Sequence, residues 1–188
     1  MVIGRHEPRE AKDTDLKKAI FIGLDEATTA LEESFHDLTD GQFWSFQIEG
    51  RHNIVTLVEH CLDCLDLYCC EVQTGQKAID HETRFDIWHF SPGQLRDKMV
   101  NLPSVASVRK RLASLKAAAL AGLETATEAE LTGPRNRQSW FWEKFHKTSA
   151  DAYFRAIEHT NAHLRQIWLM RGLMGLMDRN GWPEQHWA

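Results

Sequence analysis

Four long segments of this chain repeat apolar residues at the spacing of an α-helix, and this periodicity restricts the fold more than any other feature. The alternation of apolar and polar residues that is typical of β-strands is nearly absent, and the five prolines fall at expected element boundaries. We therefore expect an all-α protein. The expected helices span residues 14–38, 53–73, 104–126 and 149–177.

Four helices of about 20 residues each within one domain, residues 1–188, predict a four-helix bundle. Residues 76–102 form a long connection between the second and third helices, which predicts a crossover with a short helical piece at 92–99. The expected ends and connections are these: Gly75 ends the second helix; Gly181 and Pro183 end the fourth; a loop with Phe43, Trp44 and Phe46 packs over one end of the bundle; residues 130–148 form the second connection.

Composition and charge exclude two classes of partner. The formal net charge is −5, and the only cluster of basic residues, 109–111, is too short to neutralise a nucleic-acid backbone. No run approaches the roughly 18 apolar residues of a membrane span, and the charged N-terminus lacks the apolar segment of a signal peptide. We therefore expect neither nucleic acid nor membrane as a partner.

All four cysteines lie between residues 61 and 70, inside one expected helix: Cys61, Cys64, Cys69 and Cys70. A secreted protein would spread its disulfides over loops, so this clustering indicates a reducing cytoplasm. Cys61 and Cys64 have the spacing of a redox pair, but such pairs usually open a helix, and we favour the alternative of small apolar packing. Cys64 also lies four residues after His60 and could approach a metal bound there.

His159 and His163 are the most informative residues for function. They lie four residues apart, so both imidazoles project from one face of the expected helix. Ala156 and Ile167 fall on the same apolar stripe, which turns the pair toward the core, where a transition metal is one good reason for two histidines. The alternative is a pair of buried histidines bonded to other protein groups.

His60 is the best candidate for a third ligand, because it lies in the middle of the second helix, beside its apolar stripe. The other seven histidines fall at termini, in loops or at helix ends, where exposure or loop packing is expected: His6, His36, His52, His81, His89, His146 and His186.

The segments RHNIVTLVEHCLDCLDLYCCEVQTG and IEHTNAHLRQIWLMRGLMG together resemble the DinB-like superfamily, which includes YfiT-like metal-dependent hydrolases and thiol-dependent S-transferases. That family is a four-helix bundle with one histidine on the second helix and a His-x-x-x-His motif on the last. The resemblance implies a metal site formed by His60, His159 and His163. The family motif continues with residues that match Arg165, Gln166 and Arg171 here, whereas the cysteines match no family pattern.

The resemblance also implies a chemistry. Three neutral imidazoles leave coordination positions open, as in catalytic rather than structural metal sites. The implied cofactor is a divalent ion, with zinc or nickel favoured and iron or manganese also accepted by this ligand set. It would activate water or a low-molecular-weight thiol, the co-substrate, toward a small electrophilic substrate, in an S-transferase or hydrolase. A homodimer is implied as well.

Several residues near the expected ligands could take part in substrate binding or could orient the ligands. Arg165 and Arg171 can receive a substrate carboxylate, or they can form a solvated face and surface salt bridges. The second ring nitrogens of the ligands need partners, and four residues are near enough in sequence to serve: Glu59, Asp63, Glu158 and Gln166. No residue is identified as the catalytic base.

Two rival functions remain at this stage. A non-catalytic metal-binding or stress-response protein would lack a substrate-sized cleft beside the metal, and a cleft lined by Trp44, Trp88 and Trp140 would argue against it. A purely structural bundle would bind no metal, and a chelator would leave its melting temperature unchanged.

Overall fold

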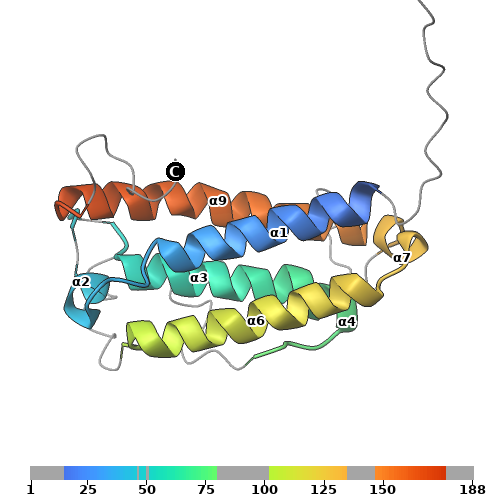
Figure 1. Ribbon diagram of the computed structural model, residues 1–188, viewed down its shortest axis with the longest axis horizontal. Helices are drawn as coiled ribbons and strands as arrows, with labels where there is room; N and C mark the ends of the chain where they lie inside the picture. The colour runs from blue at the N-terminus through green and yellow to red at the C-terminus, as the bar shows by residue number, and fades with distance from the viewer. Residues whose placement is uncertain (1–14, 46, 50, 80–101, 135–146, 177–188) are drawn as a thin grey trace, which may run out of the picture.

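The computed structural model describes residues 15–45, 47–49, 51–79, 102–134 and 147–176. Within these ranges the chain contains helices and no strand, which confirms the all-α expectation. Four long helices lie side by side (Figure 1): α1 (Asp15–Glu33), α3 (Ile54–Asp66), α6 (Val105–Thr125) and α9 (Ser149–Leu173). Helix α1 packs against α9 and α6, and α3 packs against the same two helices, so the four enclose a common core. No helix among the described residues is long and apolar enough to span a membrane.

Polar side chains mark where three of the long helices begin. The Asn53 side chain accepts a hydrogen bond from the Thr56 amide at the start of α3. The Ser104 side chain accepts one from the Ser107 amide at the start of α6. At α9, Thr148 and Asp151 form a reciprocal capping box. These caps lie within one residue of the helix starts expected at 53, 104 and 149.

The second expected helix has an internal irregularity. Helix α3 continues into a π-helical turn, η1 (Leu67–Glu71), and a last helical turn, α4 (Val72–Thr74). Gly75 then stops the helix in the left-handed conformation at φ 79°, as the sequence predicts. Three side chains of the wide turn are buried in the bundle: Tyr68, Cys69 and Cys70.

Two helix ends differ from expectation. Helix α1 ends at Glu33 rather than residue 38, because the Ser34 hydroxyl donates to the Leu31 carbonyl and the chain turns there. Helix α9 ends at Leu173 rather than residue 177, because Gly175 adopts φ 72° and the Leu176 amide donates to the Arg171 carbonyl over 3.0 Å. Gly181 and Pro183, the expected stops, lie outside the described residues.

Two expected connections contain short helices. Helix α2 (Asp40–Trp44) occupies the loop after α1, where Phe43 is fully buried and stacks on Phe35 with ring centroids 5.4 Å apart. The Trp44 indole donates to the Pro103 carbonyl over 3.0 Å, so this segment packs over one end of the bundle, as expected. Helix α7 (Glu128–Thr132) begins the second connection. The expected helical piece at 92–99, the rest of the crossover and Phe46 lie outside the described residues.

Replacing Gly75 with alanine is expected to lower the free energy of unfolding by about 1 kcal/mol, because an L-residue is strained at φ 79°. Gly41 is a matched control, since a methyl group there meets no atom within 4 Å and φ is ordinary. Urea unfolding followed by circular dichroism measures both variants. Equal effects at the two positions would contradict the strained conformation of Gly75.

Candidate metal centre

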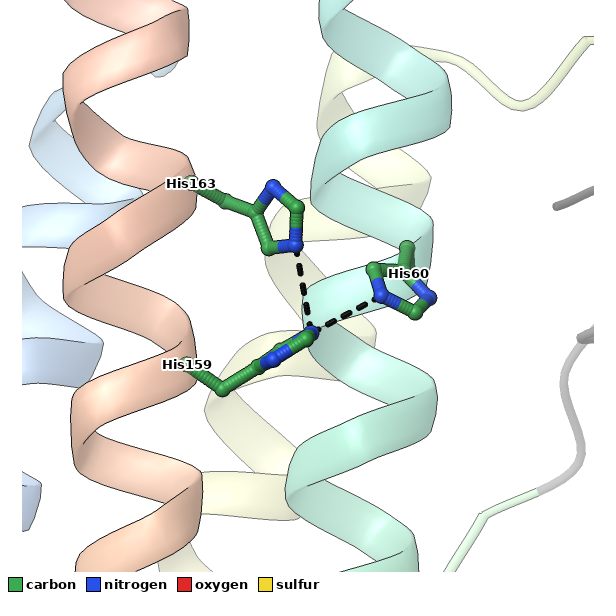
Figure 2. Close-up of side chains that lie close together, drawn as sticks. All are labelled: His60, His159 and His163. Atoms are coloured by element: carbon green, nitrogen blue, oxygen red, sulfur yellow. Dashed lines mark hydrogen bonds between the residues drawn. The ribbon is translucent and has the colours of Figure 1, made fainter.

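Three imidazoles converge between α3 and α9 (Figure 2). His60 projects from α3, and His159 and His163 project from α9 toward it. The Nε2 atom of His159 lies 2.8 Å from that of His60 and 3.2 Å from that of His163. One nitrogen from each ring lies within 4.8 Å of the other two. The structure thus brings together the three histidines that the sequence singled out.

Local sequence explains how the rings meet. The four-residue spacing of His159 and His163 places them on one face of α9, and α9 packs directly on α3. Ala156 and Ile167, on the same stripe, are both fully buried and hold this face against the core. The three rings meet edge to face, with interplanar angles of 68° to 83° and centroids 4.6 to 5.0 Å apart.

Two of the three separations between nitrogens suit a shared ion. A single ion about 2.1 Å from two imidazole nitrogens separates them by about 3.0 Å at a right angle and about 3.4 Å at a tetrahedral angle. The observed separations of 2.8 and 3.2 Å lie close to this range. Among the described residues, the group of side chains able to share an ion is limited to these three histidines.

Burial keeps the rings neutral, which is the form that binds metal. Desolvation, reinforced by the neighbouring imidazoles, lowers the pKa of His60 to about 3. Desolvation and then the charge of His163 lower the pKa of His159 to about 4. Burial also lowers the pKa of His163. At neutral pH each ring therefore carries a lone pair on one nitrogen, available to a cation.

Gln166 is positioned to orient His163. Its side-chain oxygen lies 3.1 Å from Nδ1 of His163, the ring nitrogen that faces away from the other histidines. An N–H at Nδ1 donates to this oxygen and leaves the lone pair on Nε2, where the three rings meet.

The two arginines expected near a substrate have different surroundings. Arg165 is exposed on α9. Arg171 is 5% exposed and forms a two-pronged ion pair with Asp37, with contacts of 2.7 and 2.9 Å, and a bond to the Ser34 carbonyl. That pairing ties α9 to the turn after α1 and holds the pKa of Asp37 below its usual value. Arg171 thus forms a salt bridge, but its own side chain is buried, unlike the surface salt bridge of the alternative interpretation.

Two carboxylates considered as partners for the ligands pair with arginines. Glu59, only 2% exposed, accepts two hydrogen bonds from Arg111 of α6. Glu158 pairs with Arg155 over 2.8 Å on the surface of α9. Asp63 is buried on α3.

The cysteines are buried free thiols, which agrees with apolar packing. Burial raises the pKa values of the Cys61 and Cys69 thiols well above the ordinary value for cysteine. Burial also raises the pKa values of Cys64 and Cys70 to about 12, so all four thiols stay protonated at neutral pH. The Cys64 sulfur lies 3.8 Å from Nε2 of His60 but is not among the converging ligand atoms.

The other described histidines are not in the group. His36 is exposed and contacts the Glu33 carbonyl. His52 is half-buried, and its pKa is lowered first by burial and then by the charge of His163. It therefore lies near the three histidines but is not one of the converging ligands. His6, His81, His89, His146 and His186 lie outside the described residues.

Sequence reasoning missed Arg155. It lies four residues before His159 and therefore on the same face of α9, and it bonds to the Tyr68 hydroxyl of η1. The repeated four-residue spacing, from 155 to 159 to 163, was the signal that could have identified it.

A cavity of about 810 Å³ lies away from the histidines, at the α7 end of the bundle, with Cys69, Cys70 and Tyr153 among its lining residues. The centre and Trp44 do not line it. Trp88 and Trp140, the other aromatics expected around a cleft, lie outside the described residues.

Comparison with known proteins agrees with this architecture. The family model for the DinB superfamily matches residues 23–167, a span that contains all three converging histidines and most of the described helices. No curated protein matches the chain. Because the matched span covers well over half of the sequence, the chain belongs to the DinB superfamily.

Proposed function

We propose that this protein binds one divalent metal ion through the Nε2 atoms of His60, His159 and His163 and uses it in catalysis. The substrate is a small electrophile, and the attacking group is water or a low-molecular-weight thiol. The reaction is accordingly hydrolysis or S-transfer. One observation carries the proposal: one nitrogen from each of three buried imidazoles lies within 4.8 Å of the other two, between two packed helices.

The donor set favours a catalytic ion over a structural one. Structural zinc sites are usually closed by four protein ligands, whereas this group has three and includes no carboxylate or thiol from the described residues. A bound divalent ion supplies Lewis acidity and lowers the pKa of water or a thiol in an open position. Zinc and nickel suit imidazole ligands best, and iron and manganese are the other candidates.

This chain's own residues prepare the site. Burial lowers the pKa of the rings, so protons compete less with a metal ion for the ring nitrogens, and Gln166 orients His163. Helices α3 and α9 run in opposite directions and pack against each other (Figure 1), which holds the nitrogens in place before any ligand arrives and lowers the entropic cost of binding.

Metal content tests the proposal directly. The protein, purified without an affinity tag or chelator, should contain about one divalent ion per chain by inductively coupled plasma mass spectrometry. The loaded protein should then accelerate either p-nitrophenyl acetate hydrolysis or conjugation of a thiol to 1-chloro-2,4-dinitrobenzene. Stoichiometric metal without turnover of either kind would favour a non-catalytic metal-binding protein. No metal after reconstitution with zinc, nickel and manganese would leave a structural bundle.

Replacing Gln166 with alanine is expected to weaken metal binding by about 10- to 100-fold, the usual effect of losing an oriented partner of a ligand histidine. Competition with a chromophoric chelator measures the affinity. Gln166→Glu retains the acceptor and should keep most of it. An unchanged affinity in Gln166→Ala would show that the 3.1 Å contact does not orient His163 in the loaded protein.

We also propose that the protein forms a homodimer and is located in the cytoplasm. Large apolar side chains are exposed on α1 and α9, which supports a homodimer through these helices: Phe21, Ile22, Phe154, Leu169 and Leu173. Four free, buried cysteines suit the reducing cytoplasm. Sedimentation velocity of the full chain tests the assembly, and a monomer at micromolar concentration would refute it.

A further inference from the structure

Helix α9 presents a cation beside the converging histidines. Arg155, His159 and His163 follow one another at four-residue intervals, so the Arg155 side chain leaves the same face of the helix about one turn before His159. The opposite helix contributes as well, because Arg155 donates a hydrogen bond to the hydroxyl of Tyr68, which is 6% exposed on η1. Arg155 thus spans the seam between the two segments that flank the histidines.

Arg155 also remains accessible. Its side chain is 35% exposed, at the boundary between the buried seam and solvent. Its other partner, Glu158, lies 2.8 Å away but is 72% exposed. An exposed ion pair of this kind is weak and readily exchanged. A guanidinium has five N–H donors and matches a carboxylate in a two-pronged geometry, so it can bind an anion while keeping its bond to Tyr68.

The field of this cation reaches the candidate metal ligands. The Arg155 charge is one of the causes that lower the pKa of both His159 and His163, after burial. It acts on Cys64, the neighbour of His60, as well. An anion bound at the three rings would feel the same charge.

We propose that Arg155 binds an anionic group, a carboxylate, of the small thiol that occupies the metal site. The inference rests on the proposed function and gives it a substrate class: low-molecular-weight thiols in which a carboxylate lies a few bonds from the sulfur. The sulfur is directed to the centre formed by the three imidazoles, and the carboxylate is directed to Arg155.

The two arginines first considered on this helix are poorer candidates. Arg171 is buried in its ion pair with Asp37. Arg165 is exposed, and it does not share the four-residue repeat of the histidines. Arg165 therefore provides a matched control on the same helix.

The experiment uses the full chain loaded with Co²⁺, whose thiolate charge-transfer absorption reports thiol binding without any turnover. The probes are 3-mercaptopropionate and its neutral analogue 3-mercaptopropionamide, each titrated into wild type, Arg155→Gln, Arg155→Lys and Arg165→Gln. We expect Arg155→Gln to weaken the binding of 3-mercaptopropionate by about tenfold, which is the effect expected from the loss of one charge-assisted contact. The affinity for the amide should not change. Arg155→Lys should retain part of the preference for the acid, and Arg165→Gln should behave as wild type.

The outcomes separate this inference from the function on which it rests. Equal effects of Arg155→Gln on the acid and the amide, or no effect on either, would overturn the role of Arg155 and leave the metal site standing. Cobalt binding without a thiolate band from either probe would refute the thiol class and this inference together. A wild-type chain that binds no cobalt would overturn the proposed function itself. Circular dichroism and cobalt stoichiometry of each variant show that the comparison is made between folded, loaded proteins.

Discussion

Replacing His163 with alanine is expected to reduce bound metal from about one ion per chain to background, a loss of affinity well beyond 100-fold. Removal of an orienting partner alone costs about 10- to 100-fold, and here a ligand itself is lost. His60→Ala should behave in the same way, because it removes the only imidazole in the group that α3 supplies. Metal content of the purified variants, measured by plasma mass spectrometry, provides the comparison.

Folding and specificity need separate controls in that experiment. Far-UV circular dichroism should show the helicity of wild type, since the helices are held by the apolar core rather than by the histidines. His36→Ala removes an exposed histidine outside the group and should retain the full metal content. Wild-type metal content in His60→Ala or His163→Ala would show that the ion, if present, is held elsewhere.

Replacing Arg111 with methionine is expected to lower the free energy of unfolding by about 3–5 kcal/mol, the cost of breaking a buried ion pair from one side. Arg111 of α6 bonds to both carboxylate oxygens of Glu59 on α3, and the two side chains are 14% and 3% exposed. Without the guanidinium, the Glu59 carboxylate remains buried, with 3% of its side chain exposed. Urea unfolding followed by circular dichroism measures the loss.

The neighbouring residue Arg109 provides the matched comparison. It pairs with Glu32, but the two side chains are 46% and 39% exposed, so Arg109→Met should cost less than about 1 kcal/mol. The double variant Glu59→Leu, Arg111→Met removes both charges and should recover much of the stability lost in the single variant. Similar effects of Arg111→Met and Arg109→Met would show that burial does not strengthen the pair.

Much of the helical framework was predictable because its signals are local. Apolar periodicity and the caps at Asn53, Ser104 and Thr148 depend on residues within one or two turns, so they can be recognised in the sequence. The ends of α1 and α9 were misplaced because apolar residues continue beyond them. A side-chain bond from Ser34 ends the first helix, and the left-handed Gly175 ends the other.

The irregular parts of the fold have weaker local signals. The apolar pattern of residues 53–73 predicted one continuous helix and did not indicate the π-helical turn η1. The aromatic residues of the segment that forms α2 suggested only a loop. Tyr68 in η1 and Phe43 in α2 are both directed into the bundle, although α2 also begins at a capping box of Thr39 and Gln42 that was a local signal in the sequence. Packing of this kind depends on partners that are distant in the sequence.

The sequence by itself determined the all-α class and the orientation of His159 and His163, because the four-residue spacing on a helix fixes which face two side chains share. Only the tertiary structure decided that the Nε2 atom of His60, 99 residues before that of His159 in the chain, lies 2.8 Å from it. The tertiary structure also placed Arg171 in a buried ion pair with Asp37 and Arg155 against Tyr68 of η1. The physical reason is that helix periodicity sets directions around one axis, whereas the distance between side chains on two helices depends on how their apolar faces pack and in what register.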